Sequence, residues 1–136
     1  MSVSKATDKR QTFGRYGKTF QEGLVQLIYQ DRPFADQITE VLDLNFLELE
    51  YLRVFTNKIT SYRDRNSKHP SPDALATILK TELDSEDAVI QQQVKEYFTR
   101  VTTNELDNEE YIKEKSLDFC RKQNLKEAML RSVGLL

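Results

Sequence analysis

Residues 109–133 read EEYIKEKSLDFCRKQNLKEAMLRSV, and this stretch decides the fold. It contains neither Gly nor Pro, the two residues that most disfavour a helix interior, over roughly 25 positions. Asp107 and Glu110 form a capping pattern at its start, in which side chains bind the free backbone amides of the first turn. The stretch therefore predicts a single helix that is longer than the average helix of a globular protein.

The segment before this helix predicts a second helix beside it. Ser85 can cap a helix whose apolar residues recur at helical spacing, at Val89 or Ile90 and then at Val94, Tyr97, Phe98 and Val101. Residues 104–108 are a polar connector. The two helices together predict a hairpin that projects from a small globule.

A projecting hairpin cannot bury its apolar stripe alone, so it tends to pair with a copy of itself or with a partner. Burial in the core of the single chain is the alternative role for each apolar residue of the hairpin. We expect self-association through eight of these side chains: Tyr97, Val101, Tyr111, Leu117, Phe119, Leu125, Met129 and Val133.

Four shorter helices are predicted upstream, where apolar residues recur every three or four positions in residues 19–30, 34–42, 47–65 and 72–83. Asp31 and Ser71 each precede a Pro-containing helix start, and Thr19 with Glu22 forms a capping box. The chain holds only 4 Gly and 3 Pro, fewer than the turns of an all-β protein need. The fold class is therefore all-α.

The predicted organisation has three parts. Residues 1–18 form a flexible basic arm, residues 19–103 a helical globular subdomain with the first hairpin helix, and residues 104–136 the second hairpin helix. Charge is divided along the chain, with net charges of +4 in residues 1–18, -7 in residues 81–119 and +3 in residues 120–136. A solvated surface with a loose tail is the ordinary interpretation of such blocks, and a charged docking face is the alternative.

Sites for metals and nucleotides are not indicated. The one histidine, His69, lies in a polar loop with no other His or Cys close in sequence, and we expect it to be solvent-exposed. The stretch from Gly14 to Thr19 is similar to a phosphate-binding loop, but that motif needs Gly where Thr12 stands. The lone cysteine, Cys120, lies in an apolar helical context and is expected to be buried.

Two further features bear on partners. Lys58, Tyr62, Arg63, Arg65 and Lys68 place an aromatic ring among bases, a pattern that can hold single-stranded DNA weakly. An ordinary amphipathic helix shows the same pattern and is favoured. No apolar run approaches the length of a membrane span, so we expect a soluble, cytoplasmic protein without membrane contact.

The order of several degenerate motifs resembles the N-terminal domain of DnaB-family replicative DNA helicases, most closely those of large tailed phages. The motifs cover about residues 19–136, and they are Phe20-Gln21-Glu22, Asp31-Arg32-Pro33-Phe34-Ala35, Phe46-Leu47-Glu48-Leu49-Glu50-Tyr51-Leu52, His69-Pro70-Ser71-Pro72-Asp73-Ala74-Leu75 and Tyr111 to Gln123. The resemblance implies a globular helical subdomain with a two-helix hairpin.

The resemblance also implies a non-catalytic role in DNA replication. Such domains pair through their hairpins into dimers, and three dimers form a collar on a hexameric ring. The collar contacts primase and the helicase loader, while ATP and Mg²⁺ belong to a motor domain. No residue of this chain matches a motif of that motor, so we expect a domain excised from a longer helicase, with no cofactor of its own. The alternatives are a small helical DNA-binding regulator, which would read DNA through a helix-turn-helix, or an adaptor.

Overall fold

The computed structural model describes residues 11–134, and these residues form helices without any β-strand. The predicted all-α class is therefore confirmed. The helices are η1 (Phe13–Tyr16), α2 (Gly17–Gln30), α3 (Arg32–Ile38), η2 (Leu44–Phe46), α4 (Glu50–Asn66), α5 (Pro72–Thr81), α6 (Ala88–Val101) and α7 (Glu109–Ser132). Most of the predicted arm, residues 1–10, lies outside the described residues.

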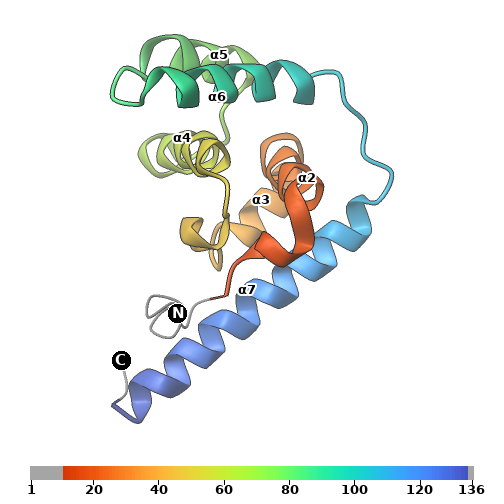
Figure 1. The fold of residues 1–136 in the computed structure, drawn as a ribbon, viewed down its shortest axis with the longest axis vertical. Coiled ribbons are helices and arrows are strands. Elements are labelled where there is room, and N and C mark those ends of the chain that lie inside the picture. The colour runs from red at the N-terminus through yellow and green to blue at the C-terminus, as the bar shows by residue number, and fades with distance from the viewer. Residues whose placement is uncertain (1–10, 135–136) are drawn as a thin grey trace, which may run out of the picture.

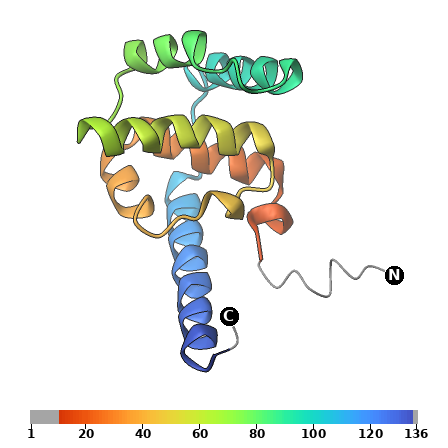
Figure 2. The same cartoon turned by 90° about the vertical axis from the view of Figure 1, so that its left-hand side faces the viewer.

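The helices form layers, with α5 and α6 on one side of α2 and α4, and α7 on the other (Figure 1). Helix α7 crosses beneath α2 and α3, and its C-terminal half extends beyond the body (Figure 2). The core includes side chains from every helix, and among its fully buried members are Phe13, Leu24, Phe55, Leu75 and Val94.

The segment that leads into α2 differs from the prediction. Residues 13–16 were expected within a flexible arm, but they form η1, and Phe13 is fully buried. Helix α2 begins at Gly17, so Thr19 does not cap it. The reason is hydrophobic: the Phe13 ring lies 4.4 Å from the ring of Phe119 on α7, which draws the chain onto the core.

Two of the predicted helix starts are confirmed. The backbone N–H of Phe34 donates to Asp31 Oδ1 (3.1 Å), and that of Ala74 donates to Ser71 Oγ (3.1 Å). Helix α6 is instead capped by Asp87, whose Oδ1 accepts from the backbone N–H of Ile90 (2.9 Å). Ser85 therefore does not cap α6, and α7 begins after Asn108 with no side-chain cap.

The predicted hairpin is wrong. Helix α6 packs against α4, whereas α7 packs against α2 and α3, so the two helices have different packing partners. Residues 102–108 carry the chain from one side of α2 to the other, as Figure 1 shows. Each helix thereby buries its apolar face in the common core instead of against the other helix.

Candidate interaction surface

The C-terminal half of α7 carries an apolar stripe that the rest of the described chain does not cover. Leu125, Met129 and Val133 are 62%, 61% and 66% exposed. A shallow hollow of about 250 Å³ is lined by Leu125 and Met129 together with Lys122, Lys126 and Leu130. Large apolar side chains that cluster on an exposed helix face mark a site of interaction.

The stripe is exposed because α7 is longer than the body that supports it. Ile112, Ser116, Phe119 and Cys120 are buried against the core. Further along, Asn124 Nδ2 donates to the carbonyl oxygen of Val41 (3.0 Å). After this bond the helix continues to Ser132 with most of its side chains exposed, since no Gly or Pro ends it earlier.

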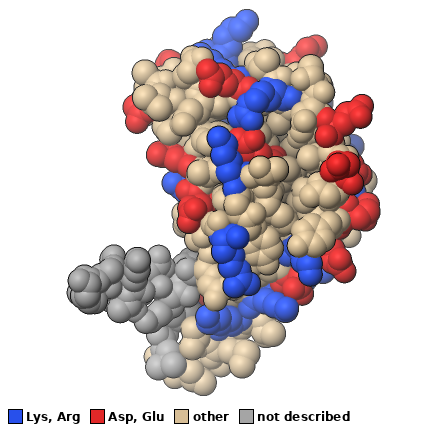
Figure 3. Space-filling model, turned by 45° about the vertical axis from the view of Figure 1, so that its right-hand side comes forward, with Lys and Arg blue, Asp and Glu red and all other residues tan. Residues whose placement is uncertain are grey.

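The exposed end is basic as well as apolar. Residues 120–136 hold four bases against one acid, a net charge of +3. Figure 3 shows Lys and Arg in a line down one face of the molecule, with Asp and Glu mostly to the sides. The bottom of that view, where α7 ends, is largely uncharged surface. The stripe therefore offers an apolar contact with cations at its margin.

The eight predicted contact residues fall into three groups. Tyr97, Val101 and Phe119 are buried in the core of the single chain, so they are not available to a partner, and Leu117 is partly buried against the same core. Tyr111 is exposed near the start of α7, where Lys115 lies over its ring (5.7 Å). Leu125, Met129 and Val133 alone form the exposed stripe at the far end.

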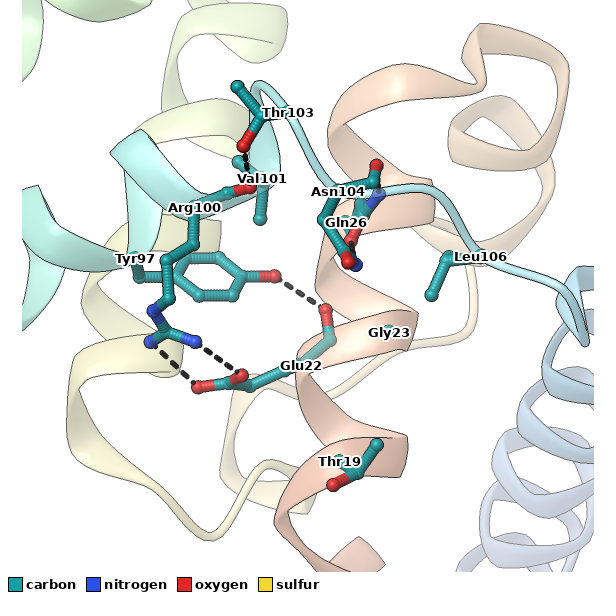
Figure 4. A pocket seen from close by; sticks show the side chains of 10 residues that line it. All are labelled: Thr19, Glu22, Gly23, Gln26, Tyr97, Arg100, Val101, Thr103, Asn104 and Leu106. Carbon is teal, nitrogen blue, oxygen red and sulfur yellow. Dashed lines mark hydrogen bonds and ion pairs between the residues drawn. The ribbon is translucent and has the colours of Figure 1, made fainter.

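A second hollow of about 430 Å³ lies between α2, the end of α6 and the connector (Figure 4). At its edge the Arg100 guanidinium donates to both carboxylate oxygens of Glu22 (2.8 and 3.1 Å), and Tyr51 donates to the same carboxylate. Tyr97 donates to the backbone carbonyl oxygen of Glu22 (2.5 Å). Glu22 therefore joins α2 to α4 and α6.

Burial opposes ionisation of Glu22, but the hydrogen bonds from Arg100 and Tyr51 outweigh it, so its pKa lies below the ordinary value. Burial and the Glu22 carboxylate raise the pKa of Tyr97 well above its ordinary value. Both side chains hold their ordinary charge at neutral pH. The cluster is an ion pair supported by two phenols, which fastens α6 to α2.

Two glutamines of α2 hold the connector next to this cluster. Buried Gln26 donates to the carbonyl oxygen of Asn104 (2.8 Å) and accepts from Asn104 Nδ2 (3.0 Å). One turn later, Gln30 Nε2 donates to the carbonyl oxygen of Val101 (2.8 Å). These bonds satisfy polar groups where α6 ends, and they fix the route by which the chain reaches α7.

These polar residues were missed by the sequence analysis. Glu22 was assigned to a capping box, and Gln26, Gln30 and Arg100 were given no role. A signal was present, because Glu22, Gln26 and Gln30 recur every four residues on one face of α2. Their partners on α6 and the connector lie more than seventy positions away in the sequence, and nothing local identifies them.

Among residues 11–134, no three His, Cys, Asp or Glu side chains are grouped closely enough to hold a metal ion. Within the same residues, no helix is both long enough and apolar enough to cross a bilayer. Comparison of the chain with protein-family models, with curated proteins and with solved structures gives no match.

Proposed function

We propose that this chain is a non-catalytic interaction domain that assembles through the exposed end of α7, with a second copy of the chain as its first partner. The observation that carries the proposal is the apolar stripe of Leu125, Met129 and Val133, which extends beyond the body on a helix held firmly at its other half. A rigid helix that presents an uncovered stripe is suited to helix-on-helix pairing.

A second copy fits this stripe for a reason of symmetry. In an isologous pair the same patch serves both chains, so one exposed stripe covers the other and no different complementary surface is required. The cations at the margin, Lys122 and Lys126, oppose such pairing by like-charge repulsion. Apolar burial must therefore supply the stabilisation.

The biological setting that we propose is DNA replication. The order of motifs that resembles DnaB-family helicases supports it. The all-α class agrees with that resemblance, whereas the two-helix hairpin that it implies is not formed. In this setting the domain belongs to a cytoplasmic helicase. Its pairing organises a collar, which recruits primase or the helicase loader, and ATP hydrolysis belongs to a separate motor domain.

The experiment is a measurement of solution mass by light scattering over a range of protein concentrations. We expect the wild-type chain to form dimers or a higher even-numbered assembly as the concentration rises. Met129→Asp should leave a monomer with unchanged helicity, because it places a charge in the centre of the stripe. Ala128→Asp is the matched control, since Ala128 is exposed on the same turn but lies off the stripe.

The effect of added salt distinguishes self-association from binding of an acidic partner. Screening weakens repulsion between two basic stripes, so added salt should preserve or strengthen self-association. An acidic partner would be released by salt instead. A strict monomer at high concentration, or equal effects of Met129→Asp and Ala128→Asp, would contradict self-association through this stripe.

A further inference from the structure

His69 lies in the loop between α4 and α5 and makes a hydrogen bond through each ring nitrogen. Its Nε2 is 2.7 Å from the carbonyl oxygen of Tyr29 on α2, and its Nδ1 is 2.8 Å from Nη1 of Arg63 on α4. The side chain is half-buried. The sequence predicted a solvent-exposed loop histidine, and this prediction is wrong. His69 holds the loop to two helices.

The two partners determine where the ring carries its proton. A carbonyl oxygen can only accept and a guanidinium can only donate, so Nε2 is the donor and Nδ1 the acceptor. The ring is therefore neutral in this arrangement. Arg63 also donates to Asp36 on α3. A chain of polar contacts thus runs from Asp36 through Arg63 and His69 to the backbone of Tyr29.

We propose that His69 is a charge-controlled latch, which ties residues 67–71 to Arg63 of α4 while the ring is neutral and breaks that tie when the ring is protonated. A protonated imidazole carries a donor on both nitrogens, so its Nδ1 cannot accept from Arg63. Two cations would then face each other at a separation of 2.8 Å. Arg63 and the ring must then separate, while the Nε2 N–H still donates to the carbonyl oxygen of Tyr29.

The surroundings of the ring carry charges of both signs. The ring borders a polar hollow of about 270 Å³ that is lined by Arg32 and Asp36 of α3, Arg63 and Asp64 of α4, and Lys68 of the loop. These groups are three cations and two carboxylates. From α2, Tyr29 offers its carbonyl oxygen, and burial raises the pKa of its phenol, which stays neutral.

The latch matters for the position of α5. Pro70 is buried next to His69, and Ser71 caps α5 through its bond with the backbone N–H of Ala74. Loss of the contact with Arg63 loosens the segment that sets where α5 begins. Histidine is the side chain that ordinarily changes charge between pH 5 and 8. Protonation of the ring should therefore loosen this loop.

The first test uses the one histidine of the chain, whose imidazole signals need no assignment. Nitrogen-15 NMR of the wild-type ring at pH 7.5 should show the tautomer protonated at Nε2. A ring protonated at Nδ1, or an averaged mixture of both tautomers, would overturn the proposal.

The second test is amide hydrogen exchange of Ser67, whose backbone N–H donates to the carbonyl oxygen of Arg63 (2.9 Å), at pH 7.5 and 5.5, corrected for the intrinsic effect of pH. We expect exchange to be roughly five- to tenfold faster at pH 5.5, the size expected from one lost hydrogen bond. His69→Gln keeps one donor and one acceptor without a charge, so its exchange should not change with pH. Lys68→Gln removes a neighbouring charge and should behave as the wild type. Equal pH responses of wild type and His69→Gln would overturn the latch.

Discussion

Gly23 on α2 and Ile112 on α7 lie so close together that a β-carbon at position 23 would be 2.8 Å from Cδ1 of Ile112. The next neighbour, Cδ2 of Leu106, would be 3.5 Å away. This close approach is what allows α7 to lie against α2 where α7 begins. The lack of a side chain at Gly23 therefore determines how closely the N-terminal part of α7 packs against α2.

Gly23→Ala should lower the free energy of unfolding. Overpacking typically costs about 1–3 kcal/mol, while alanine in a helix interior returns about 1 kcal/mol relative to glycine. Ile112→Val removes the Cδ1 atom, so the double variant should be more stable than the two single changes together predict. Urea denaturation of all four proteins measures this coupling. Additive effects would show that the two positions do not touch.

Glu22→Gln should lower stability at neutral pH by roughly 1–2 kcal/mol, since a half-exposed Arg100 makes the pair weaker than a buried one. The folded-state pKa of Glu22 is depressed, so its contribution is present at neutral pH and is lost as pH falls below the ordinary value of 4.5. The difference between wild type and variant should therefore shrink in acid. Denaturation midpoints measured from pH 7 to pH 3 test this.

The control for Glu22 is Asp118→Asn, which breaks an exposed pair with Lys122 on α7 (3.0 Å). Exposed pairs contribute little, and the change should stay below about 0.5 kcal/mol. A Glu22→Gln variant that is no less stable than Asp118→Asn would mean that the ion pair does not hold α6 to α2.

Phe13→Ala should destabilise the chain by about 3–5 kcal/mol, the usual cost of removing a buried phenylalanine. The ring is fully buried and packs on Phe46 and Phe119. Arg15→Ala, an exposed change in the same short helix, should alter stability by less than about 0.5 kcal/mol. Thermal unfolding followed by circular dichroism separates the two. Equally small stability changes in the two variants would favour the flexible arm that the sequence predicted.

Cys120 should resist alkylation in the folded protein. Burial raises the pKa of its thiol to about 12, and the reactive thiolate is correspondingly scarce at pH 8. We expect iodoacetamide to react roughly a hundredfold more slowly with the native chain than with the chain unfolded in urea. Mass spectrometry over time measures both rates.

An exposed thiol provides the comparison for Cys120. In a Cys120→Ala background, Ser132→Cys places a thiol near the exposed end of α7. This thiol should react at the same rate in the native and unfolded chains. If Cys120 in the native chain reacted as fast as the Ser132→Cys thiol, the first half of α7 would not be packed against the core.

Local chemistry determined much of the fold. The spacing of apolar residues and the scarcity of Gly and Pro predicted an all-helical chain, and Asp31 and Ser71 begin α3 and α5 as their caps predicted. The length of α7 was also predicted, because an uninterrupted run of helix formers needs no distant contact to be recognised. The burial of Cys120 followed from its apolar context.

Only the tertiary structure decided which helices meet. The sequence analysis placed α6 and α7 together in a hairpin because they are neighbours along the chain. In the structure, Gln26 and Gln30 bind the connector where it crosses α2, and the missing side chain of Gly23 lets α7 pack closely there. An apolar stripe specifies that a helix face must be buried, and it does not specify against what. For this reason the sequence alone could not separate Tyr97 and Phe119, which are core, from Leu125 and Met129, which are surface.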